Sequence, residues 1–182
     1  MAFRLFLIPV FLFSISMIGL AQPPAADSVL SEAMRTAARE NKNVFILFHA
    51  SWCIWCHKMD SSMNDQRCKL LFNDNYVIRH LTVLESEKNK RFENPGANAM
   101  LARYRAHDDG IPFWLVFDKE GKLLADSRIK AEGAALNTKG RNSGCPATKE
   151  EVDYFISVLR NTSRLSAAQL EIIEKRFKEN DN

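Results

Sequence analysis

Five consecutive residues, Cys53-Ile54-Trp55-Cys56-His57, match two patterns of residue types that perform different chemistry. Two cysteines separated by two residues lie one helical turn apart, so their sulfurs can form and break a disulfide. The same residues match the haem-attachment pattern, in which both sulfurs become thioethers and the histidine binds iron. These two chemistries exclude each other, so the elements around the motif have to decide between them.

The elements around these residues favour the dithiol. Residues 43–50, NVFILFHA, form a continuous apolar run that predicts a buried strand directly before the motif. Met59 and Met63 follow at helical spacing and predict a helix after it. A protein with a single attached haem would be mainly helical, whereas residues 111–127 predict a β-hairpin with its turn at 118–121. A motif match counts only in its structural context, so haem attachment is the weaker alternative.

Further helices and strands are predicted along the chain. Thr148 and Ser166 each stand three residues before a glutamate or glutamine, which is the spacing of a capping box. Thr148 therefore predicts the start of a helix over 148–161, and Ser166 the start of a helix over 166–180. Asp27 is expected to cap an N-terminal helix that runs to about residue 41. The remaining predictions are a helix over 66–73, a strand over 76–84, a solvated loop over 85–96 without catalytic residues, a helix over 97–107 and a long loop over 129–147.

The N-terminal segment has the layout of a secretory signal peptide. Arg4 precedes an apolar run over 5–20 that ends in small residues. The run is shorter than the ~20 apolar residues that a membrane-spanning helix needs, so we expect residues 1–21 to be cleaved rather than to anchor the protein. Residues 22–26 then form a tether, and residues 27–182 have the length of a single domain.

Charge and cysteine content restrict the function classes. The chain has 25 Lys and Arg against 22 Asp and Glu, a net charge of +3, which is too small to indicate nucleic acid or an anionic membrane surface as a partner. Export places the four cysteines in a compartment where disulfides persist. Four cysteines are too few to staple a chain of this length, so the close pair requires a separate function.

A Cys-X-X-Cys between an apolar strand and a helix, followed later by Gly-Ile-Pro at the head of another strand, resembles the thioredoxin-like superfamily. The resemblance extends over residues 27–160 and is strongest to exported bacterial members. It implies an α/β fold with a central mixed β-sheet flanked by helices, to which the predicted helix over 166–180 adds an extra C-terminal element. The residues that carry the resemblance are Trp52, Cys53, Cys56, Lys58, Met59, Gly110, Ile111 and Pro112.

The resemblance also implies a cis peptide bond between Ile111 and Pro112, packed against the dithiol. From the residues alone, Pro112 only begins a strand, where proline is tolerated. One position departs from the family pattern: thioredoxins proper have a buried acid six residues before the first cysteine, where this chain has Leu47. The proton carrier of those proteins is therefore missing, and the direction of electron flow stays open.

We expect Cys53 to be the attacking cysteine and Cys56 the resolving one. Cys53 stands at the start of a helix, where unpaired backbone N–H groups and the helix dipole favour a thiolate. His57 follows four residues later, so its imidazole either approaches the Cys53 sulfur and stabilises the thiolate or faces solvent without a role. Trp52 and Trp55 are expected to form an apolar rim for substrates, with partial core packing as the alternative for Trp52.

The sequence thus predicts an exported, periplasmic thiol-disulfide oxidoreductase with no cofactor beyond its own dithiol and no bound metal. Its partners would be protein disulfides or dithiols and a redox partner that the sequence does not identify, and we expect a monomer. One alternative is a thioredoxin-fold protein that binds copper or zinc through the two thiols and His57. Structural zinc would require two further ligands, which no second Cys-X-X-Cys supplies. Another alternative is a redox-inert interaction module.

The two remaining cysteines, Cys68 and Cys145, are expected not to bridge each other. In the resembled fold, the helix after the motif runs away from the dithiol, which places Cys68 near the far end of the sheet and Cys145 on the side of the dithiol. A disulfide requires Cα atoms within ~7 Å, so this separation excludes a bridge. Cys145 could then act as a third redox thiol, whereas Cys68 is a buried small residue.

Overall fold

A computed structural model describes residues 22–131, 133–136 and 138–181. The predicted signal peptide over residues 1–21 lies outside the described residues. Within the described ranges, no helix is long and apolar enough to cross a membrane.

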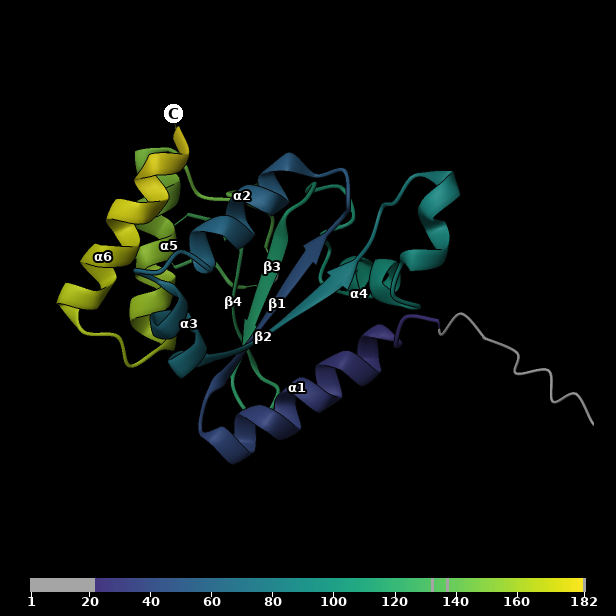
Figure 1. Cartoon of the computed structure of the whole chain (residues 1–182), viewed down its shortest axis with the longest axis horizontal. Coiled ribbons are helices and arrows are strands. Elements are labelled where there is room, and N and C mark those ends of the chain that lie inside the picture. Colours follow the sequence, from purple (N-terminus) through teal and green to yellow (C-terminus); the bar gives the residue numbers. More distant parts are fainter. Residues whose placement is uncertain (1–21, 132, 137, 182) are drawn as a thin grey trace, which may run out of the picture.

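Six α-helices and a four-stranded sheet make up most of the described chain (Figure 1). The elements of the first half are α1 (Ala26–Glu40), β1 (Asn43–His49), α2 (Ile54–Met63), α3 (Lys69–Asn75), β2 (Tyr76–Thr82), the 3₁₀ helix η1 (Glu87–Phe92) and α4 (Ala97–Arg103). Those of the second half are β3 (Phe113–Phe117), β4 (Leu123–Asp126), β5 (Arg128–Ile129), β6 (Arg141–Asn142), α5 (Lys149–Thr162), α6 (Ala167–Lys178) and the 3₁₀ turn η2 (Glu179–Asp181).

The central sheet is mixed and has the strand order β2-β1-β3-β4. β1 pairs in parallel with β2 and antiparallel with β3, and β4 completes the predicted hairpin with β3. This arrangement confirms the predicted α/β fold and the buried strand before the cysteines. Because β1 and β2 are parallel, with His49 opposite Thr82, the segments that follow both strands emerge at the same edge of the sheet.

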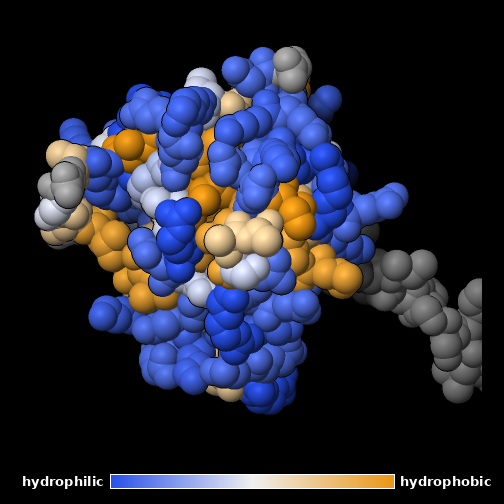
Figure 2. All heavy atoms as spheres, turned by 90° about the vertical axis from the view of Figure 1, so that its left-hand side faces the viewer, coloured by the Kyte–Doolittle hydropathy of each residue, from blue (hydrophilic) through white to orange (hydrophobic). Residues whose placement is uncertain are grey.

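The two faces of the sheet bury separate apolar clusters because side chains alternate along each strand. Phe45, Leu47 and Trp114 point to the face that α2, α3, α5 and α6 cover. The alternate positions of β1 and β3 point to the face covered by α1 and α4. In Figure 1, α5 and α6 lie to the left of the sheet, while α1 lies below it. Figure 2 shows the α6 side, where apolar surface appears among hydrophilic side chains; Leu70 and Ile172 are exposed apolar residues of α3 and α6.

The predicted capping boxes are confirmed, whereas the predicted cap at Asp27 is wrong. The side chains of Thr148 and Ser166 accept from the third backbone N–H of α5 and α6, with the reciprocal bond present in both. α1 begins at Ala26 and has no side-chain cap. The backbone N–H of Ala26 donates instead to the carbonyl of Pro95 at 2.8 Å, so this helix start is satisfied by a neighbouring loop. The expected tether is thus partly packed against that loop.

Other elements also differ from the predictions: the helix predicted over 97–107 ends at Arg103, and the long loop predicted over 129–147 contains β6. The helix predicted over 66–73 begins at Lys69, because the Asp65 carboxylate accepts the backbone N–H of Arg67 and forms a local turn there. The predicted solvated loop over 85–96 contains η1 and two buried polar residues, Glu85 and Asn94. The first of these residues contacts the segment that carries the cysteines.

Candidate redox-active site

A disulfide joins Cys53 to Cys56 at the start of α2, with Cα atoms 5.2 Å apart. Cys53 is the N-cap residue of α2, and its sulfur accepts the backbone N–H of Cys56 at 3.1 Å. Cys53 is 4% exposed and Cys56 is fully buried. The sulfur of Cys53 therefore faces the positive end of the helix and is the more accessible of the two.

The segment before β3 closes one side of the disulfide. The Ile111–Pro112 peptide bond is cis. The carbonyl oxygen of Ile111 lies 3.7 Å from the Cys53 sulfur. The Ile111 side chain packs against an apolar cluster of Ala50, Cys53 and Cys56. The two residues that the resemblance placed beside the dithiol are therefore adjacent to it in space.

Four exposed apolar residues surround the disulfide, and we call them the apolar rim. They are Trp52, Ile54, Trp55 and Leu84, with exposed fractions of 57%, 72%, 47% and 40%. The indole N–H of Trp52 donates to the Leu84 carbonyl at 2.8 Å, which ties the motif to the end of β2. The ammonium of Lys58 lies 4.5 Å from the centroid of the Trp55 ring and holds it by a cation–π contact.

Ser51, two residues before the first cysteine, is bonded from two sides. The buried carboxylate of Glu85 accepts its backbone N–H at 2.6 Å and its hydroxyl at 2.8 Å. Burial alone would raise the pKa of Glu85, but the hydrogen bonds from Ser51 and Asn89 and the charge of His49 together lower this pKa overall. On the other side, Nε2 of His57 lies 3.0 Å from the Ser51 carbonyl oxygen. Of the two alternatives for His57, the approach to the Cys53 sulfur is not the contact observed, because the exposed imidazole contacts the backbone of Ser51.

A pair of histidines lies behind the motif, between β1, β2 and α2. The rings of His49 and His80 meet edge to face at 5.1 Å, and Nε2 of His80 lies 2.7 Å from the Asp60 carboxylate. Burial, and next the charge of His80, lower the pKa of His49. Leu47 is fully buried, so an apolar side chain occupies the position where thioredoxins proper have an acid. Across the described residues, His, Cys, Asp and Glu side chains form no group of three or more that could hold a metal ion.

Cys68 and Cys145 are both buried free cysteines in the structure. Burial raises the pKa of Cys68 to about 11 and that of Cys145 to about 12, which disfavours the thiolate of each. Cys145 follows Gly144, at which an added Cβ would touch Pro112. The buried Asn180 covers it: its side-chain N–H donates to the Cys145 sulfur at 3.5 Å and to the Pro146 carbonyl at 3.1 Å.

The same Asn180 reaches the helix that carries the disulfide. Its backbone carbonyl accepts the ammonium of Lys58 at 3.0 Å, and its side-chain oxygen accepts the hydroxyl of Ser62 at 3.0 Å. Figure 1 shows the C-terminal end close to α2, at the upper end of the sheet. The turn η2 therefore links α2 to the segment that holds Cys145.

A cavity of about 400 Å³ opens beside Trp55 and the Ile111–Pro112 segment that closes the disulfide. Residues from four separate parts of the chain line it, among them Trp55, Pro112, Ser143, Cys145, Glu151 and Asp181. One wall belongs to the rim and another to the C-terminal turn. The cavity thus lies between Trp55, the Ile111–Pro112 segment and the segment that holds Cys145.

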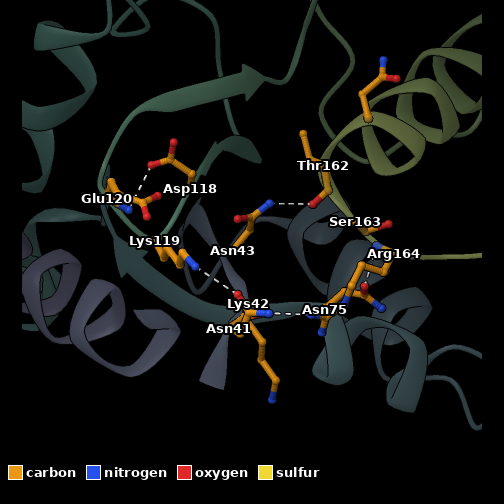
Figure 3. Close-up of a pocket in the computed structure, with 11 residues that line it drawn as sticks. Asn41, Lys42, Asn43, Asn75, Asp118, Lys119, Glu120, Thr162, Ser163 and Arg164 are labelled. Atoms are coloured by element: carbon orange, nitrogen blue, oxygen red, sulfur yellow. Dashed lines mark hydrogen bonds between the residues drawn. The ribbon is translucent and has the colours of Figure 1, made fainter. Parts of the chain in front are cut away.

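A second hollow, of about 320 Å³, lies at the opposite end of the sheet, where β1 and β2 begin (Figure 3). Figure 3 shows polar side chains converging from the ends of α1 and α5 and from the β3–β4 turn. Asn43 donates to the Thr162 carbonyl at 2.7 Å, and Arg164 donates to the Asn41 carbonyl at 3.2 Å. These contacts satisfy the carbonyl groups that helices leave unpaired at their C-terminal ends.

The sequence did not reveal three residues that shape the site: Glu85, Asn142 and Asn180. A signal for Glu85 exists, because this acid directly follows the predicted strand over 76–84, and segments that follow two parallel strands emerge at the same edge of the sheet. Asn142 lies in the predicted long loop, and its side chain donates to the Pro112 carbonyl at 3.1 Å. Asn180 lies 122 residues from its partner Lys58. Neither asparagine belongs to a motif, so local sequence patterns carry no signal for them.

Comparisons with known proteins agree with this architecture. A family model described as thioredoxin-like matches residues 25–119, more than half of the chain. Among solved structures, a disulphide isomerase from Xylella fastidiosa Temecula1 is similar at 17% identity and a TM-score of 0.47, with 90% of this chain and 99% of that chain covered.

Two further solved structures are similar at a TM-score of 0.41. A DsbH oxidoreductase shows 20% identity over 84% of this chain and 95% of that chain. The oxidised C-terminal domain of DsbD from Neisseria meningitidis shows 21% identity over 77% of this chain and 98% of that chain. At these identities and TM-scores, the likeness carries no argument about activity. No curated protein matches the chain.

Proposed function

Because the chain belongs to the thioredoxin-like family and links Cys53 to Cys56 at the start of α2, we propose that it is a thiol-disulfide oxidoreductase acting on protein substrates. The observation that carries the proposal is the N-cap position of Cys53. In the dithiol form, the backbone N–H of Cys56 and the dipole of α2 stabilise a thiolate at this sulfur.

The reaction proceeds through one mixed disulfide. The Cys53 thiolate attacks one sulfur of a substrate disulfide, forms a new S–S bond and releases the other substrate sulfur as a thiolate. The Cys56 thiolate then attacks the Cys53 sulfur, closes the intramolecular disulfide and releases the second substrate sulfur. The substrate gains two electrons, and its two thiolates take up the protons that Cys53 and Cys56 gave up. The same steps in reverse oxidise a substrate dithiol.

The surroundings of the disulfide suit a protein substrate. The apolar rim exposes two tryptophans, an isoleucine and a leucine around the sulfurs, which favours contact with an unfolded or extended chain. The cavity beside Trp55 and Pro112 accommodates a side chain of that substrate. We place the protein in the periplasm as a monomer, with residues 1–21 removed on export and the thioredoxin-like domain in the rest of the chain.

Thiol trapping tests the proposed roles. The purified mature protein is expected to catalyse dithiol-dependent reduction of insulin. Cys53→Ser abolishes the reaction, whereas Cys56→Ser accumulates mixed disulfides because the resolving attack is lost. Equal trapping by both single variants would contradict the assignment of roles, and absence of catalysis by the wild-type protein would contradict the function itself.

A separate measurement tests export. When the full chain is produced in a bacterium, the protein of the periplasmic fraction is expected to begin at Gln22. A protein that keeps residues 1–21 and stays with the membrane would contradict cleavage. The reduction potential of the Cys53/Cys56 couple against glutathione then tells whether the enzyme reduces or oxidises its substrates.

A further inference from the structure

One asparagine side chain binds three of the four carbonyl groups in the segment that closes the disulfide. Nδ2 of Asn142 donates to the carbonyl oxygens of Asp109 at 3.0 Å and Pro112 at 3.1 Å, with a longer contact to Gly110 at 3.4 Å. The fourth carbonyl, that of Ile111, is the one that lies 3.7 Å from the Cys53 sulfur. Three carbonyls of the segment therefore point to Asn142, and the fourth points to the disulfide.

Asn142 is itself held in place by its neighbours. Its side-chain oxygen accepts the backbone N–H of Gly144 at 3.0 Å, and in β6 it pairs with Arg128 of β5. The next residue, Ser143, donates its backbone N–H to the Ser127 carbonyl at 2.8 Å. The Gly144 carbonyl accepts the indole N–H of Trp114 at 3.0 Å. An amide fixed in this way can orient the groups it binds rather than follow them.

The buried Arg128 supports the same segment from its other side. Its guanidinium donates to the carbonyls of Tyr104 at 3.2 Å and Arg105 at 3.3 Å, and it approaches the Asp109 carboxylate at 3.4 Å. Arg128 is 2% exposed and is neutralised by the fully buried Asp126. The residue at which the segment begins, Asp109, is thus bonded through its backbone by Asn142 and through its side chain by Arg128.

We propose that Asn142 is a positioning residue of the disulfide-exchange centre: by binding the carbonyls on both sides of Ile111, it directs the Ile111 carbonyl at the Cys53 sulfur. This inference rests on the proposed function and adds a residue to its site. A carbonyl oxygen presents the negative end of its dipole, so it accepts an S–H but repels a thiolate. Asn142 therefore moderates the stabilisation that the helix start gives to the Cys53 thiolate.

Other charged groups around the sulfur set the background against which this contact acts. They are His57 and Lys58 on α2, Glu85 after β2, Asp109 in the segment itself, and Glu151 and Asp181 across the cavity. Substitution of Asn142 changes none of these charges. Its effect on Cys53 is therefore separable from theirs.

Alkylation of the reduced protein tests the proposal. Asn142→Ala removes the bonds that hold the Ile111 carbonyl toward the Cys53 sulfur. The rate at which iodoacetamide modifies Cys53 at pH 7 is therefore expected to rise about threefold, which corresponds to the free energy of one weak hydrogen bond. Tandem mass spectrometry places the label on Cys53. Asn142→Gln keeps an amide on a longer side chain and is expected to give a rate between those of Asn142→Ala and the wild type.

Asn75 provides a matched control at the other end of the sheet. Its Nδ2 also donates to a backbone carbonyl, that of Leu71 at 2.8 Å, and its side-chain oxygen also accepts a backbone N–H, that of Arg164 at 2.8 Å. Asn75→Ala is expected to lower the thermal midpoint as Asn142→Ala does, with no change in Cys53 alkylation. An unchanged or slower rate in Asn142→Ala, or an equal rise in Asn75→Ala, would overturn the proposal. The alkylation assay needs no substrate, so its outcome is independent of the insulin assay that tests the function.

Discussion

The two ends of the sheet use similar polar side chains for different purposes. At the disulfide end, Glu85, Asn142 and Asn180 bond to backbone groups of the segments around the two cysteines. At the opposite end, residues such as Asn43 and Arg164 bond to the last carbonyls of helices around a polar hollow. One set of bonds fixes geometry around reactive atoms, and the other closes the ends of helices.

The difference lies in what each end leaves exposed. The hollow of Figure 3 is lined by polar residues, among them Asn41, Lys42 and Asp118, and it exposes groups that water satisfies. The disulfide end leaves the apolar rim exposed and hides its polar anchors beneath it. Apolar surface held in a fixed shape is suited to a protein partner. Polar bonding alone therefore does not distinguish a functional end from a structural one, and the groups left exposed do.

The largest effect is expected from Glu85→Ala. Loss of the carboxylate leaves the N–H and hydroxyl of Ser51 without their acceptor and should lower the free energy of unfolding by about 2 kcal/mol, as for hydrogen bonds to a charged group. Because Ser51 adjoins the motif, insulin reduction should slow as well. Denaturant unfolding and the insulin assay measure the two effects.

Asp118→Ala is the control for Glu85→Ala. The Asp118 carboxylate also accepts two backbone N–H groups, those of Glu120 at 3.1 Å and Lys122 at 2.8 Å, but at the opposite end of the sheet. Its loss should cost about 1 kcal/mol and leave insulin reduction unchanged. A slower reaction in this variant would break the distinction between the two ends.

The second effect concerns the cover that Asn180 gives to Cys145. Asn180→Ala removes the side chain that contacts the sulfur, so alkylation of Cys145 in the native protein should accelerate roughly tenfold through easier local opening. Cys68 serves as an internal control, since it is also buried and free, whereas the Asn180 side chain bonds to the Cys145 sulfur. Equal acceleration at both cysteines would indicate general loosening instead of a local cover.

The third effect is a change in the pH dependence of stability. The pKa of Glu85 in the folded protein lies below its ordinary value of 4.5, so the ionised carboxylate stabilises the fold above about pH 4.5. This contribution is lost as the pH falls through the lower, folded-state pKa. Glu85→Gln should therefore flatten the loss of stability in that acidic window, as measured by denaturant unfolding at a series of pH values. An unchanged slope would show that Glu85 does not contribute to it.

The smallest effect is expected from Arg164→Ala. The exposed guanidinium bonds to the carbonyls of Asn41 and Asp74 in the polar hollow, so its removal should change stability by no more than about 0.5 kcal/mol. Insulin reduction and the alkylation rate of Cys53 should both equal those of the wild type. A measurable change in either would mean that the two ends are coupled through the sheet.

The parts of the fold that local patterns encode were predictable. The apolar run before Cys53, the capping boxes at Thr148 and Ser166 and the hairpin turn at 118–121 each depend on residues within a few positions of one another. Asp27 failed as a cap because a distant loop supplies the acceptor for the first N–H of α1. A competing tertiary contact of this kind leaves no trace in the local sequence.

The candidate site was predictable in its reactive atoms and, through the resemblance, in the Ile111–Pro112 segment beside them. The spacing of Cys53 and Cys56 identifies them, whereas the residues that bond to the segments around them lie far away in the sequence. The Asn142 side chain is 30 residues from the Pro112 carbonyl it binds. Its role depends on where β6 places it, and a two-residue strand inside a glycine-containing loop has no periodicity that would reveal it.

The contact between Lys58 and Asn180 spans 122 residues and so has a consequence in time. Because a ribosome adds residues from the N-terminus, Cys53 and Cys56 are present before Cys145, and Asn180 is added later still. Until the last turn is made, the thiol of Cys145 lacks the side chain that covers it in the folded structure. Cys145 can therefore be buried fully only after nearly the whole chain has been synthesised.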